Sequence, residues 1–113
     1  MFKIYHNPRC SKSREVLEIL KSNNCQIEII EYLKNPPSFD EIKDLLIRLH
    51  LKPIDMIRQN ETLFKTKFKN KNFSDEEWIM IIIENPILIE RPIVVRKNKA
   101  VICRPPENVL TLL

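Results

Sequence analysis

The chain has 113 residues, of which 43% are hydrophobic, so it holds enough material for one domain with one core. Its net charge of +4 is modest, and the densest basic stretch, Lys65 to Lys71, is expected to be a solvated surface loop and not a nucleic-acid site. No apolar run reaches the roughly 18 residues of a membrane span, and no signal-peptide layout is present at the N-terminus. We therefore expect a soluble, cytoplasmic protein with no nucleic-acid or membrane partner.

The cysteine and glycine counts exclude several kinds of site. Three cysteines are an odd number for a disulfide framework, and neither CxxC nor zinc-ligand spacing occurs, so we expect free thiols and no metal. A chain with no glycine has no glycine-rich phosphate loop, dinucleotide fingerprint or P-loop. Backbone positions that need a positive φ are expected to use asparagine instead.

The first third of the sequence predicts a βαβ unit. Residues 2–5 are rich in strand-forming types and stop at the His-Asn-Pro turn signal of residues 6–8, just before Cys10. The spacing of apolar residues then becomes helical over 11–22. Residues 26–30 alternate as a second strand, which is parallel to the first if the helix is the crossover.

The middle of the sequence predicts helices. Two capping boxes, each a serine followed three residues later by a glutamate, precede amphipathic stretches. The capping boxes are Ser38 with Glu41 and Ser74 with Glu77, and a short helix is expected between them over about residues 53–58.

The last part of the sequence predicts a β-hairpin and a terminal helix. Residues 93–96 and 99–102 are expected to be antiparallel strands joined by a tight turn, and residues 110–113 end the chain as a helix. This element order is typical of the α/β class, with a mixed β-sheet in a thioredoxin-like fold. A helical insertion, about residues 38–85, separates the N-terminal βαβ unit from the C-terminal hairpin and helix. We predict a single domain over residues 1–113.

Cys10 is the strongest candidate for chemistry. It stands where the loop after the first strand becomes a helix, next to unsatisfied N–H groups and the positive end of the helix dipole. This position favours a thiolate, which is the nucleophilic form, and the same N–H groups attract an oxyanion. Its neighbours are cations, hydroxyls and a histidine: Arg9, Lys12, Arg14, Ser11, Ser13 and His6.

Each of these assignments has a plainer alternative. Cys10 could be an ordinary buried cysteine, although its polar neighbours argue against this. Cys25, at the start of a predicted apolar strand, and Cys103, between Ile102 and Arg104, fit that description better. His6 is equally compatible with a turn residue that bonds the backbone.

Three arginines occur at the ends of predicted elements, where a rigid turn could direct them. A guanidinium bonds two oxygens at once and stays charged, so arginine suits a multi-oxygen anion. Considered singly, each is more often a surface residue than a ligand, so the residues alone leave both interpretations open. The three are Arg58 after an apolar helix, Arg91 before Pro92 and Arg104 before Pro105.

Four segments of the sequence together resemble the glutaredoxin-linked arsenate reductase family, the ArsC-like proteins. They are HNPRCSKSR (6–14), NPPS (35–38), NPILIERPIVV (85–95) and CRPPE (103–107). The resemblance runs essentially from end to end, and four segments in order with fitting intervals are highly specific. Ser-Lys follows the cysteine here, whereas plasmid-type reductases commonly have Gly-Thr, so the chain is most similar to chromosomal members.

The resemblance implies a thioredoxin-like oxidoreductase that reduces arsenate, or a related small oxyanion, to arsenite. It implies that Cys10 is the catalytic thiolate, that His6 favours this thiolate, and that Arg58, Arg91 and Arg104 form an oxyanion-binding triad. Glutathione would be the co-substrate and glutaredoxin the protein partner, with no bound cofactor and no metal. The resemblance also places a cis peptide bond between Arg91 and Pro92.

Other functions remain open from the sequence. A general glutathione-dependent thiol oxidoreductase would share the fold and the cysteine. A regulatory binding module of the Spx type, which binds RNA polymerase, usually carries CxxC, whereas Ser13 stands at the fourth position here. An arsenate reductase related to low-molecular-weight phosphatases needs an arginine six residues after the cysteine, and the residue there is Val16, which excludes that mechanism.

Overall fold

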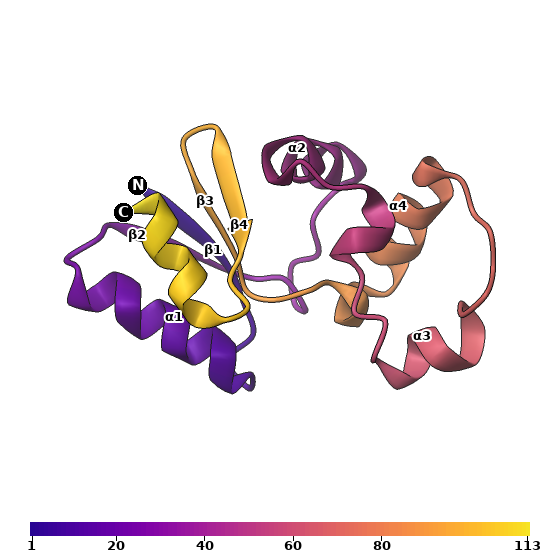
Figure 1. Cartoon of the computed structure of the whole chain (residues 1–113), viewed down its shortest axis with the longest axis horizontal. Helices are drawn as coiled ribbons and strands as arrows, with labels where there is room; N and C mark the ends of the chain where they lie inside the picture. The colour runs from indigo at the N-terminus through magenta and orange to yellow at the C-terminus, as the bar shows by residue number, and fades with distance from the viewer. The chain divides into compact units, whose positions relative to one another are not determined.

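The computed structural model describes all 113 residues, and the chain divides into two compact units. The first unit comprises Met1–Asn35 with Arg91–Leu113, and the second comprises Pro36–Glu90. Figure 1 traces both along the chain. The second unit contains the predicted helical insertion, whose predicted bounds of 38–85 lie inside it. The single domain over the whole chain stays a prediction.

A four-stranded mixed sheet forms the first unit, with the strand order β2-β1-β3-β4. β1 (Phe2–His6) pairs in parallel with β2 (Ile27–Glu31) and antiparallel with β3 (Ile93–Arg96). β3 pairs antiparallel with β4 (Lys99–Ile102). α1 (Ser11–Ser22) connects β1 to β2, so the predicted βαβ unit and hairpin are both confirmed.

One face of this sheet packs against α1 and against the terminal 3-10 helix η3 (Pro106–Leu112), which lie side by side in Figure 1 in purple and yellow. Alternate residues of the strands and residues four apart on α1 point into the shared core. η3 begins earlier than the predicted terminal helix, because proline fits the first turn of a helix. The buried core residues are Phe2, Ile4, Val16, Leu20, Val94, Cys103, Val109 and Leu112.

The second unit is helical, as predicted. Its long helices begin where the capping residues place them: Ser38 Oγ accepts the Glu41 N–H, and Ser74 and Glu77 form a reciprocal capping box. The last long helix, α4, packs against the first, α2, and against two short 3-10 helices. The elements are α2 (Phe39–Leu49), η1 (Pro53–Met56), α3 (Thr62–Lys67), α4 (Asp75–Glu84) and η2 (Pro86–Leu88).

The helix α3 corrects one prediction. The basic stretch from Lys65 to Lys71 was expected to be a loop, but α3 runs through Lys67. Phe64 is buried and its ring stacks at 6.1 Å from that of Trp78 on α4. This tertiary contact stabilises a six-residue helix that is too short to form by itself.

Positive φ values occur at four residues, and asparagine accounts for Asn24 and Asn70 only. His50 and Lys97 also have positive φ, so the expectation that asparagine would fill these positions was wrong for both. His50 is the C-cap of α2, and its N–H donates to Ile47 O, which satisfies a helix-end carbonyl. Separately, no helix in the chain is both long and apolar enough to cross a membrane.

Candidate active site

Cys10 is the N-cap of α1, as the sequence predicted. Its backbone is extended, with φ −94° and ψ 121°, and the Arg14 N–H donates to Cys10 O as the helix begins. Before the cysteine, Asn7 organises a tight turn: Asn7 Oδ1 accepts the Arg9 N–H, and Asn7 O accepts the Cys10 N–H, both at 3.0 Å. The half-buried sulfur therefore sits at the N-terminus of a helix of 12 residues.

The surroundings of Cys10 favour its thiolate. Burial alone would raise the pKa of the thiol. A hydrogen bond from the Ser13 backbone N–H, the Arg91 guanidinium and the Lys12 N–H together outweigh burial, so the pKa lies below its ordinary value. His6 is not among these groups, and its predicted support of the thiolate stays a prediction.

His6 and Ser13 form a buried polar pair beside the cysteine loop. His6 is 6% exposed and Ser13 is fully buried. His6 Nδ1 and Ser13 Oγ are 2.6 Å apart, and Ser13 Oγ also accepts the Asn7 N–H at 3.1 Å. The sequence indicated Ser13 only as one of several nearby hydroxyls, because a contact across the loop has no signal in the local pattern.

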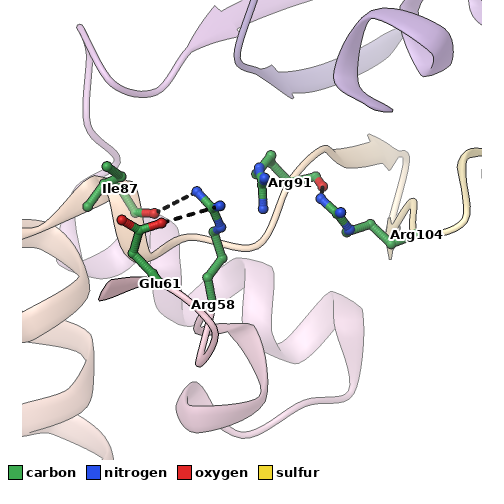
Figure 2. A network of polar contacts seen from close by, with 5 residues as sticks. All are labelled: Arg58, Glu61, Ile87, Arg91 and Arg104. Atoms are coloured by element: carbon green, nitrogen blue, oxygen red, sulfur yellow. Dashed lines mark hydrogen bonds and ion pairs between the residues drawn. The ribbon is translucent and has the colours of Figure 1, made fainter. Parts of the chain in front are cut away.

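Arg91 and Arg104 are brought together by the β-hairpin. Arg91 comes just before β3 and Arg104 just after β4, and Arg104 Nη1 donates to Arg91 O at 3.3 Å (Figure 2). Both arginines precede a cis-proline, Pro92 and Pro105, the first of which the resemblance predicted. Because the start of β3 pairs with the end of β1 at Tyr5, Arg91 also lies near the cysteine loop.

Arg58 belongs to the second unit. Its backbone N–H donates to Leu88 O at 2.7 Å, beside an antiparallel bridge between Ile57 and Ile89. Its guanidinium contacts Glu61 Oε2 at 3.3 Å and donates to Ile87 O at 3.4 Å (Figure 2). The contact with Glu61 was not predicted. A single triad of Arg58 with Arg91 and Arg104 stays a prediction.

The remaining cysteines differ from Cys10. Cys103 is buried in the core of the first unit, and burial raises the pKa of its thiol to about 12. Its thiol is therefore neutral near pH 7. Cys25 is half-buried and lies two residues before β2.

The native protein should be alkylated selectively. Iodoacetamide at pH 7 is expected to modify Cys10 well before Cys103, because the thiolate is the reactive form and Cys103 is both neutral and buried. Mass spectrometry of peptides after timed quenching measures the two rates in a Cys25→Ser background. Modification of Cys103 as fast as Cys10 would contradict these thiol environments.

The burial of His6 should make folding sensitive to mild acid. Burial lowers the pKa of His6 below its ordinary value of 6.5; Glu31 opposes this shift, whereas Arg14 and Lys21 add to it. As the pH falls below about 6.5, the unfolded chain takes up a proton that the folded chain does not. The free energy of unfolding is therefore expected to be highest above this pH, where both states hold a neutral His6, and to decrease below it.

Urea unfolding between pH 7.5 and 5.5 tests this expectation, and these pH values bracket about one unit on each side of an ordinary histidine pKa. His6→Gln should flatten the pH dependence, and His50→Gln, which alters the exposed second histidine, is the matched variant for comparison. Equal wild-type free energies at both ends of the range would show that His6 titrates normally.

Known proteins match this chain over almost its whole length. The model of the ArsC family matches residues 5–112. The uncharacterized protein YfgD of Escherichia coli is 45% identical over 98% of this chain and 95% of its own length. An arsenate reductase of Neisseria meningitidis is 39% identical over 98% of this chain and 97% of its own length.

Solved structures agree with these relatives. The arsenate reductase from Vibrio cholerae superposes with a TM-score of 0.93 at 42% identity, covering 99% of this chain and 97% of that one. The predicted fold class, thioredoxin-like with a mixed sheet and a helical insertion, is therefore confirmed.

Proposed function

The chain belongs to the ArsC family, and on this premise we propose that it is an arsenate reductase that uses glutathione and glutaredoxin. The observation that carries the proposal is Cys10, a thiol of lowered pKa at a helix N-terminus beside Arg91. Relatives named arsenate reductase that match over nearly the whole chain support arsenate as the substrate. Such a reaction requires a compartment that keeps glutathione reduced, which agrees with a cytoplasmic location.

The first proposed step is attack of the Cys10 thiolate on arsenic. A bond forms between Sγ and arsenic(V), and one arsenate oxygen leaves as water. Arg91 and Arg104, which contact each other, bind the remaining oxygens and offset their negative charge. The part of Arg58, the third arginine of the predicted triad, is tested by its own variant. His6 supports the thiolate from the buried side of the loop.

The later steps transfer two electrons from thiols to arsenic. A glutathione thiol replaces a second oxygen on arsenic, and that oxygen also leaves as water. A glutaredoxin thiolate then attacks the glutathione sulfur, and the electron pair of the sulfur–arsenic bond reduces arsenic(V) to arsenic(III). The products are a mixed disulfide of glutaredoxin with glutathione and arsenic(III) on Cys10. Water cleaves that last bond, which releases arsenite and the Cys10 thiol.

A general glutathione-dependent thiol oxidoreductase is the second candidate. The lowered pKa of Cys10 favours it equally, because exchange with a glutathione mixed disulfide also starts from a thiolate. The arginines distinguish the two candidates, since disulfide exchange needs no cluster of guanidinium groups. An Spx-type module is disfavoured because Ser13, where that class has a second cysteine, is buried and bonded to the His6 ring.

The test measures arsenite formed by the purified protein from arsenate with glutathione and glutaredoxin. Parallel reactions omit each thiol in turn, and one adds excess inorganic phosphate as a competing tetrahedral anion. We expect arsenite only in the complete mixture, with a lower rate in the presence of phosphate. Arsenite formed equally well without glutaredoxin would contradict the proposal that glutaredoxin is the protein partner.

A second substrate separates the two candidate functions. The same protein is given a glutathionylated peptide in place of arsenate, and release of the free peptide thiol is followed. Rapid release with no arsenite from arsenate would replace the proposed reaction with general thiol exchange. No turnover of either substrate, despite rapid alkylation of Cys10, would overturn both.

A further inference from the structure

Ser13 connects three parts of the first unit that meet at the cysteine loop. Its hydroxyl oxygen accepts the Asn7 N–H at 3.1 Å and lies 2.6 Å from Nδ1 of His6, the last residue of β1. Its own backbone belongs to the first turn of α1. Ser13 is fully buried, so water does not compete for these bonds.

The donors and acceptors of Ser13, Asn7 and His6 indicate where the hydrogen atoms lie. A hydroxyl has one hydrogen to donate and two lone pairs. One lone pair accepts the Asn7 N–H, and Nδ1 is the acceptor that the structure places within reach of the buried hydroxyl hydrogen, which would otherwise be unsatisfied. Nδ1 accepts only in the neutral ring that carries its proton on Nε2. Burial, which lowers the pKa of His6, favours the same neutral ring.

We propose that Ser13 is a positioning residue whose hydroxyl clamps the end of β1 and the Asn7 turn to α1, and so holds the Lys12 and Ser13 N–H groups toward Cys10 Sγ. The inference deepens the proposed function, because it assigns the alignment of the nucleophile to a residue that does not touch substrate. It also gives His6 an indirect part: the neutral ring holds the Ser13 hydroxyl, and the Ser13 backbone holds the sulfur.

The charged groups around His6 and Ser13 are compatible with the positioning role proposed for Ser13. Arg91 reaches the sulfur from the loop before β3, independently of the Ser13 hydroxyl. Glu31 on β2 and the cations Arg14 and Lys21 on α1 act on His6 with opposite signs. Removing the Ser13 hydroxyl therefore leaves these charged groups in place and changes only how the backbone N–H groups are positioned.

The test compares the pH dependence of Cys10 alkylation in the wild type, Ser13→Ala and Ser11→Ala, all in a Cys25→Ser background. Ser11 lies in the same turn of α1 but is exposed, so its variant removes a hydroxyl without removing the clamp. We expect the midpoint to rise in Ser13→Ala by about one pH unit, which leaves roughly tenfold less thiolate at neutral pH. Ser11→Ala should match the wild type. An unchanged midpoint in folded Ser13→Ala would overturn the proposal.

A second measurement needs no variant of Ser13 and keeps the proposal open to refutation if Ser13→Ala fails to fold. The ¹⁵N chemical shifts of the His6 ring report which nitrogen carries the proton, and the chain has only two histidines, so His50→Gln assigns the signals. We expect a neutral ring protonated on Nε2 at pH 7. A proton on Nδ1, or a cationic ring, would contradict the clamp.

Neither measurement uses arsenate or glutathione, so the proposed function and this inference can fail separately. If wild-type turnover occurs, Ser13→Ala should lower kcat at neutral pH, recover at higher pH, and leave KM for arsenate nearly unchanged. A loss that appears in KM alone would instead place Ser13 in substrate binding. No wild-type turnover, together with the expected midpoint shift, would remove the proposed substrate and keep the clamp.

Discussion

Replacing Cys10 by serine is expected to abolish arsenite formation while leaving the fold intact. A serine hydroxyl is not ionised at neutral pH, so no nucleophile remains, and losses of roughly 10³-fold or more are the scale for removing one. Serine is also a preferred N-cap residue, so α1 should be as stable in Cys10→Ser as in the wild type. Arsenite production and urea unfolding, measured on the same preparations, test both halves of the expectation.

Cys25→Ser is the matched control, because it makes the same atomic change at a half-buried cysteine outside the candidate site. It should retain the wild-type rate. If Cys10→Ser also turned over arsenate at the wild-type rate, the nucleophile would have to be another group. Cys103 could not easily take that part, since it is buried with a thiol of raised pKa.

Truncating the arginines should produce the second largest effect. Alanine at Arg58, Arg91 or Arg104 is expected to weaken the transition state by about 2 to 4 kcal/mol, or roughly 30- to 1,000-fold in kcat/KM, if each guanidinium is held in place for the oxyanion. Lysine should restore little, because an ammonium cannot bond two oxygens in the planar geometry of a guanidinium. Steady-state kinetics with arsenate measure each loss.

The three arginine variants should differ in their effect on the thiol. Arg91 is the one that lowers the pKa of Cys10, so Arg91→Ala should also slow Cys10 alkylation at neutral pH. Arg58→Ala should leave alkylation unchanged, since Arg58 is not among the groups that lower the pKa of Cys10 and its guanidinium pairs with Glu61. Arg48→Ala, which removes a surface pair with Asp44, is the control. Wild-type kinetics in all three triad variants would mean that the oxyanion binds elsewhere.

Local features of the sequence predicted the elements that local physics determines. The start of α1 at Ser11 follows from the change to helical spacing after the turn signal, and the start of α4 follows from the capping box at Ser74. The strands follow from short apolar runs between turn signals. α3 was not predicted, because the contact of Phe64 with Trp78, far along the chain, stabilises it. The terminal helix was predicted too short because it begins at Pro106, directly after Pro105, and two consecutive prolines are also typical of a break between elements.

The candidate site divides in the same way. Cys10 could be identified from the sequence because its environment is the helix that follows it directly. The contact of Arg104 with the Arg91 carbonyl depends on strand pairing across the hairpin, and sequence spacing alone could only suggest it. The clamp at Ser13 was not predicted, since its hydroxyl bonds residues six and seven positions earlier, across a turn. Long-range geometry of this kind is set by packing.

The central position of β1 has a consequence for how the reactive loop moves. β1 is paired on both sides, whereas β2 and β4 are the edges of the sheet and open first in local fluctuations. Amide hydrogens of β1 should therefore exchange with solvent only when the sheet opens as a whole. The loop that carries Cys10 leaves the sheet directly from this strand. The residues where this loop leaves β1 thus belong to the part of the unit that opens most slowly. Local opening of the edge strands β2 and β4 therefore does not displace the sulfur of Cys10.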